Sequence, residues 1–136
     1  MKVLYTSLMM AGLLVVTGCN VSTTGGGAGG TFKLKGPEKS TTLKHGGTEV
    51  VDINVSEDKN FKEDIALSAT VTPDGKGVTT SLEPATVKAG DPKTSKLTVK
   101  AKDDAADGDY DITVTGKPTK GEPTKLVVKV NVPKKK

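Results

Sequence analysis

Hydrophobic and polar residues alternate along seven separate segments of the chain. The clearest segments are 51–55, 65–71 and 126–132, where valine, isoleucine and leucine occupy most of the alternate positions. The other segments are 32–34, 78–82, 97–101 and 110–114. A period of two, with β-branched residues on one face, is typical of an antiparallel strand with one buried side. No segment after residue 30 has a helical period, so we predict an all-β domain of about seven strands.

The number and spacing of these strands predict how they pack. About seven short strands in roughly 100 residues, separated by glycine and proline turns, are typical of an immunoglobulin-like antiparallel β-sandwich. We predict one such domain over residues 31–133, followed by a lysine tail at 134–136. A small closed barrel is the alternative architecture for the same pattern.

The first 18 residues have the composition of an export signal. Lys2 supplies a positive charge, residues 3–16 are largely apolar, and small residues follow at 17–18. An apolar run of about 14 residues is shorter than the roughly 20 that a membrane-spanning helix needs. We therefore predict a cleaved signal peptide over residues 1–18.

The end of this signal, Val16-Thr17-Gly18-Cys19, resembles the lipobox of bacterial lipoproteins. The resemblance implies cleavage between Gly18 and Cys19, and attachment of fatty-acyl chains such as palmitate to Cys19. A thiolate is the nucleophile that accepts the lipid, and two or three chains hold a protein stably in a bilayer. The alternative is a buried structural cysteine after a fortuitously apolar N-terminus.

The residues after Cys19 predict how the domain is held. Asn20 stands where an aspartate commonly keeps Gram-negative lipoproteins at the inner membrane, so the resemblance favours the outer membrane or cell surface. Residues 19–30 are rich in glycine, serine and threonine. Such segments behave as flexible coils, so we predict a tether. A phosphate-binding loop is the alternative, but the lysine of a P-loop is missing.

Composition and charge exclude several classes of function. The chain has a net charge of +4, and all 20 basic side chains are lysine. Arginine, which reads bases and phosphates best, is absent, and aromatic residues make up 3% of the chain. We therefore predict no nucleic-acid partner, and weak stacking against sugars. No motif indicates a cofactor or a catalytic residue.

The segment Ala105–Thr115 resembles the penultimate strand of bacterial immunoglobulin-like and fibronectin-like domains. In that family a turn glycine and a tyrosine precede an alternating strand, and the tyrosine hydroxyl bonds to the backbone a few residues upstream. Gly108 and Tyr110 match those positions. Position 106 is alanine, where many members have aspartate, and Ile112 replaces the cysteine of antibody domains.

Aspartates crowd the same segment: Asp103, Asp104, Asp107 and Asp109, followed by Asp111. Several carboxylates close together are the ligands that Ca²⁺ prefers, although the spacing is not that of an EF-hand. We interpret the cluster as a solvated acidic turn, with a Ca²⁺ site as the alternative. His45, in a glycine-containing turn, is interpreted as an exposed residue. The lysine tail is interpreted as solubilising, with binding to an anionic surface as the alternative.

These features predict a membrane-anchored, extracytoplasmic lipoprotein that is not an enzyme. Its immunoglobulin-like domain would serve a structural or protein-interaction role, with the membrane and envelope proteins as partners. The alternative is a surface module that binds Ca²⁺ or a glycan.

Overall fold

The computed structural model describes residues 23–27 and 30–136. The predicted signal peptide, Gly18, Cys19 and residues 20–22 and 28–29 lie outside the described residues. The described part is all-β and contains no helix that could cross a membrane. Its strands are β1 (Thr23–Gly27), β2 (Gly30–Lys35), β3 (Thr41–Thr42), β4 (Thr48–Glu57), β5 (Ile65–Thr72), β6 (Val78–Glu83), β7 (Thr86–Val87), β8 (Thr94–Ala101), β9 (Gly108–Pro118), β10 (Gly121–Glu122) and β11 (Thr124–Val132).

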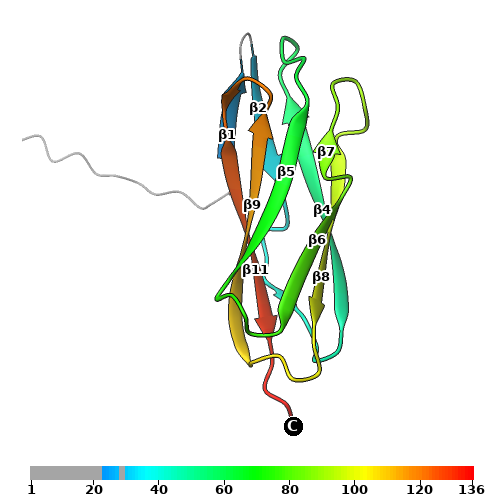
Figure 1. Cartoon of the computed structure of the whole chain (residues 1–136), viewed down its shortest axis with the longest axis vertical. Coiled ribbons are helices and arrows are strands. Elements are labelled where there is room, and N and C mark those ends of the chain that lie inside the picture. The colour runs from blue at the N-terminus through cyan, green and yellow to red at the C-terminus, as the bar shows by residue number, and fades with distance from the viewer. Residues whose placement is uncertain (1–22, 28–29) are drawn as a thin grey trace, which may run out of the picture.

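The strands form two sheets, as Figure 1 shows. The first has the order β10-β1-β2-β4-β8-β6, and the second has the order β3-β11-β9-β5-β7. Every pair is antiparallel except β3 with β11, which run parallel. The wholly antiparallel arrangement expected from the sequence is therefore wrong at this one pair. The reason is that the chain leaves β2 and enters the opposite sheet without reversing its direction.

The core lies between the two sheets and is built by the alternation seen in the sequence. The inward positions of the seven long strands, apart from Glu49 at the start of β4, are buried or partly buried, and the outward positions are mostly exposed. Phe32 and Phe61 provide the one aromatic contact of the described residues, with ring centroids 5.2 Å apart. Aliphatic side chains supply the rest of the buried cluster. Burial of this apolar surface is the main force that holds the sheets together.

All seven expected strands are present, and four short strands join them. The difference with the greatest consequence is β1, because residues 23–27 belong to the segment predicted as a flexible tether. Its backbone pairs with β2 from Thr23 opposite Leu34 to Gly27 opposite Gly30. Glycine has no side chain to show a period of two, so its pairing, which uses the backbone alone, left no signal in the hydrophobic pattern.

The chain changes sheets between β2 and β3, and this step shapes one edge of the molecule. After Lys35 the chain turns away at Gly36-Pro37, and β3 then pairs with β11 in the second sheet. Proline has no backbone N–H and cannot continue a ladder as a donor. Among the described residues, no strand therefore pairs with the first half of β4 on the side that β2 vacates.

Candidate functional site

The open edge of β4 extends from Thr48 to Ile53. On one side, β8 pairs with β4 from Thr48 to Asn54. On the other side, β2 pairs with it only from Asn54 to Glu57. Within the described residues, the segment 48–53 thus has a single neighbouring strand. An edge of this kind presents backbone N–H and C=O groups that another strand can use.

Three hydrogen bonds show which backbone groups of β4 face the open side. The Val55 N–H donates to the Lys93 carbonyl at 2.7 Å, and the Gly47 carbonyl accepts from Ala101 at 3.0 Å, both on the β8 side. The Asp58 N–H donates to the Thr31 carbonyl at 2.8 Å, on the β2 side. Because backbone groups alternate between the two edges of a strand, even-numbered residues face β2. The backbone groups of Val50 and Asp52 therefore face the open edge.

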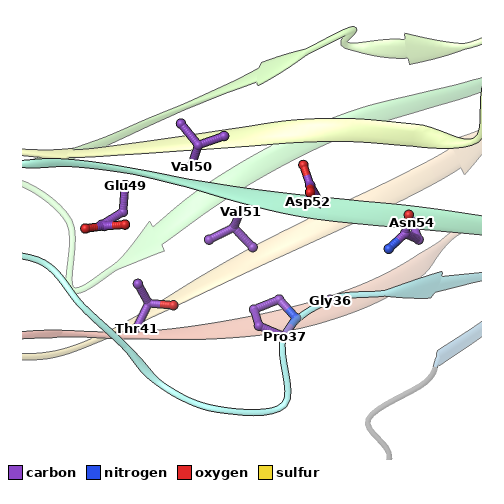
Figure 2. Close-up of a pocket in the computed structure, with 8 residues that line it drawn as sticks. All are labelled: Gly36, Pro37, Thr41, Glu49, Val50, Val51, Asp52 and Asn54. Atoms are coloured by element: carbon purple, nitrogen blue, oxygen red, sulfur yellow. The ribbon is translucent and has the colours of Figure 1, made fainter.

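A groove lies along this edge, and Figure 2 shows the residues that line it. Its volume is about 480 Å³, and Pro37 and Thr41 border it opposite β4. Its lining consists of Gly36, Pro37, Thr41, Glu49, Val50, Val51, Asp52 and Asn54. The Val50 residue is 55% exposed, on the outward face of the sheet. The groove thus combines an uncovered backbone edge with an exposed apolar side chain.

The charge of the groove is negative. Glu49 and Asp52 are among its eight lining residues, which include no lysine or histidine. Neither carboxylate belongs to an ion pair within the described part of the chain, whose two such pairs are His45 with Asp107 and Lys93 with Glu57. The edge therefore presents two carboxylates that form no direct ion pair, although Lys96 of β8 lies opposite Asp52 in the ladder.

The alternation of hydrophobic and polar residues does not predict this edge, although it departs from its pattern at one position. Val50 and Val51 are adjacent, so Val50 interrupts the strict alternation on the polar face of its strand. A single exposed apolar residue is common on protein surfaces, so Val50 alone is a weak signal for an interface. The departure of β2 at Gly36 decides where the edge opens, and that depends on tertiary structure.

His45 lies elsewhere, where the 43–47 turn meets the end of β11. The sequence predicted an exposed side chain, and this prediction is wrong. Its side chain is 14% exposed, and Nε2 lies 2.9 Å from both Asp107 Oδ1 and the Pro133 carbonyl oxygen. A single N–H shared between these two acceptors connects three segments of the chain. Nδ1 is buried without a hydrogen-bond partner. The turn packs against the 102–108 loop, and this packing buries the ring.

The aspartates proposed as a Ca²⁺ site do not converge. Asp107 contacts His45 Nε2, and Asp109 Oδ1 accepts a hydrogen bond from Asn131 Nδ2 at 2.6 Å. The Asp103 carboxylate lies against Gly46, and Asp104 is exposed. Within residues 30–136, no group of three or more acidic, histidine or cysteine side chains is arranged to hold a metal ion. The cluster therefore consists of separate polar contacts, and the Ca²⁺ alternative gains no support.

Tyr110 and Gly108 lie at the start of β9. The Tyr110 hydroxyl donates to the Ala106 carbonyl at 2.6 Å, and it lies 3.4 Å from the Lys76 carbonyl. Burial, and secondarily the nearby Asp107 carboxylate, raise the pKa of Tyr110 above its usual value. Gly108 has a φ of +136°, which disfavours residues with a side chain. Both residues therefore fix the turn that leads into β9.

The lysine tail, Lys134–Lys136, follows the end of β11 and is exposed. The Lys135 ammonium donates to the Asp103 carbonyl at 3.5 Å, a long contact. This contact places the tail near the 102–108 loop.

No protein-family model and no curated protein sequence matches this chain. Solved structures with a similar fold exist. The crystal structure of domains 4 and 5 of the S-layer protein SbsC matches with a TM-score of 0.55 and 17% identity, covering 74% of this chain and 51% of that chain. The structure of SbsC domains 1–6 matches with a TM-score of 0.50 and 18% identity, covering 74% of this chain and 12% of that one.

The chain thus spans about half the length of the shorter SbsC structure and a smaller share of the longer one. At such low identity the likeness concerns the fold and not the function. It agrees with an all-β domain built from two sheets.

Proposed function

We propose that this chain is a membrane-anchored lipoprotein of a bacterial cell envelope. Its lipid would be carried on Cys19, and its immunoglobulin-like β-sandwich would serve a structural or protein-interaction role outside the cytoplasm. The observation that carries the proposal is the lipobox-like Val16–Cys19 segment, placed directly after an apolar run and close before the first described strand at Thr23.

Several features support the proposed immunoglobulin-like fold and its protein-interaction role. The order of the strands in the two sheets is compatible with an immunoglobulin-like sandwich. The Tyr110 hydroxyl also donates to the backbone four residues upstream, as the corner tyrosine of such domains does. A similar fold occurs in the solved structures of domains of the S-layer protein SbsC. The open edge of β4 supplies a surface on which a partner can dock.

The anchor is tested by the intact mass of the protein extracted from membranes of its host, compared with that of a Cys19→Ala variant. We expect a chain that begins at Cys19 and carries acyl mass, and we expect both the cleavage and the added mass to be lost in the variant. A conservative Asn20→Gln variant is the matched control, and it should be processed as the wild type is. An unmodified chain that still carries residues 1–18 would contradict the proposal.

A further inference from the structure

We propose that the open edge of β4 binds an extended segment of a partner protein, as an added strand in which a lysine or arginine side chain faces Asp52. This inference deepens the proposed protein-interaction role and rests on it. The site is the groove formed by Glu49, Val50, Asp52 and the Gly36-Pro37 turn.

The backbone of β4 determines that the ligand is a strand. Val50 and Asp52 direct their N–H and C=O groups toward the open side, and the alternation is fixed by the hydrogen bonds of Val55 and Asp58. A peptide that lies in the position vacated by β2 completes the ladder at these two residues. Added strands gain affinity from main-chain hydrogen bonds and specificity from alternate side chains.

The outward face of β4 determines the side chains of the ligand. Val50 presents an apolar side chain, and Asp52 presents a carboxylate two residues further along on the same face. The covered edge of β4 already shows a strand that suits this face. There, β8 places Lys96 opposite Asp52 and Thr98 opposite Val50. Opposite charges directly across a sheet stabilise the pair, and like charges destabilise it.

The probe is therefore a peptide copied from β8. A synthetic peptide with the sequence of residues 93–101 and blocked ends is titrated into the purified full chain in detergent. Amide hydrogen exchange is then followed residue by residue. We expect the amides of Val50 and Asp52 to become protected. The amides of Val51 and Ile53, which already face β8, should not change, and this alternation distinguishes strand addition from general stabilisation.

The charge requirement is tested on both partners. A peptide with Lys96→Glu and Lys100→Glu, and a protein with Asp52→Lys, should each lower affinity at least about tenfold. The matched control is Asp111→Lys, an exposed carboxylate on β9 in the other sheet, which should leave affinity unchanged. A Val50→Pro variant removes one donor of the open edge without removing a β8 hydrogen bond, and it should also weaken binding. Circular dichroism checks that each variant is folded. If Val50→Pro does not fold, the affinity of the Asp52→Lys variant decides the test.

Three results would overturn the inference. The first is no protection of Val50 and Asp52 at millimolar peptide. The second is protection of a different edge. The third is protection of Val50 and Asp52 that appears without peptide as the protein concentration rises, because the occupant would then be a second copy of this chain. None of these results depends on whether Cys19 carries a lipid, so a failure here is distinguishable from a failure of the anchor.

Discussion

At the residue scale, the hydroxyl of Tyr110 makes a contact that a single substitution can isolate. The ring is buried in the core, and its oxygen donates to the Ala106 carbonyl at 2.6 Å. We expect Tyr110→Phe to keep the packing and lower the free energy of unfolding by about 0.5–1.5 kcal/mol. Urea unfolding at neutral pH measures the difference. A variant as stable as the wild type would show that the contact contributes nothing to the fold.

The same residue predicts how stability responds to alkaline pH. Burial and the Asp107 carboxylate raise the pKa of Tyr110 in the folded chain, whereas in the unfolded chain the group titrates near its usual value of about 10. The unfolded state therefore loses this proton first, and the stabilising contribution of the neutral phenol declines once the pH exceeds about 10.

We expect the stability advantage of the wild type over Tyr110→Phe to be full at about pH 8 and smaller at about pH 11. Unfolding of both proteins by urea at the two pH values gives the comparison, and lysine titration cancels because both chains share the same lysines. An advantage that stays constant or grows between these values would contradict the raised pKa.

At the element scale, Gly116 sets how closely β9 approaches the opposite sheet. A Cβ at this position would lie 3.1 Å from Phe32 Cε2, 3.2 Å from Leu34 Cδ1 and 3.3 Å from Ile65 Cγ2. We expect Gly116→Ala to lower the free energy of unfolding by about 1–3 kcal/mol through overpacking. Thermal or urea unfolding measures the loss.

A second substitution separates crowding from other effects of the alanine. Leu34→Val removes a methylene from one of the crowded side chains, so the double variant should lose less than the sum of the two single losses. Strict additivity would mean that the strain lies in the backbone of β9 and not in its contact with β2.

The extent to which the sequence predicts this fold also differs between elements. The seven long strands were predictable because one buried face imposes a period of two, which Ile53, Ile112 and Val128 illustrate. The short strands β3, β7 and β10 were not, because two residues are too few to show a period. The open edge of β4 was not predictable either, since it arises where Gly36-Pro37 sends the chain to the other sheet. The aspartates suggested one site because sequence proximity conceals that Asp107 and Asp109 contact different partners.

At the scale of the whole molecule, β1 decides where the folded domain begins. It pairs with β2 along its length, and its last two residues also pair with β10. A chain that starts at Thr23 should therefore be more stable than one that starts at Gly30. The difference should be on the order of 1 kcal/mol, because ordering the three glycines of β1 offsets much of the gain from the ladder. Urea unfolding of the two truncated chains is the measurement.

The outcome also sets the distance between the domain and the membrane, if Cys19 carries the proposed lipid. With β1 formed, only residues 19–22 separate the lipid from the first strand, and four residues span at most about 14 Å. Thr23 pairs with Leu34, two residues before Gly36, so β1 begins at the end of β2 that adjoins the groove. A partner strand would then bind close to the bilayer. Equal stability of the two chains would instead mean that residues 23–29 are free to extend, so the domain could stand further away and the groove would be open to partners distant from the membrane.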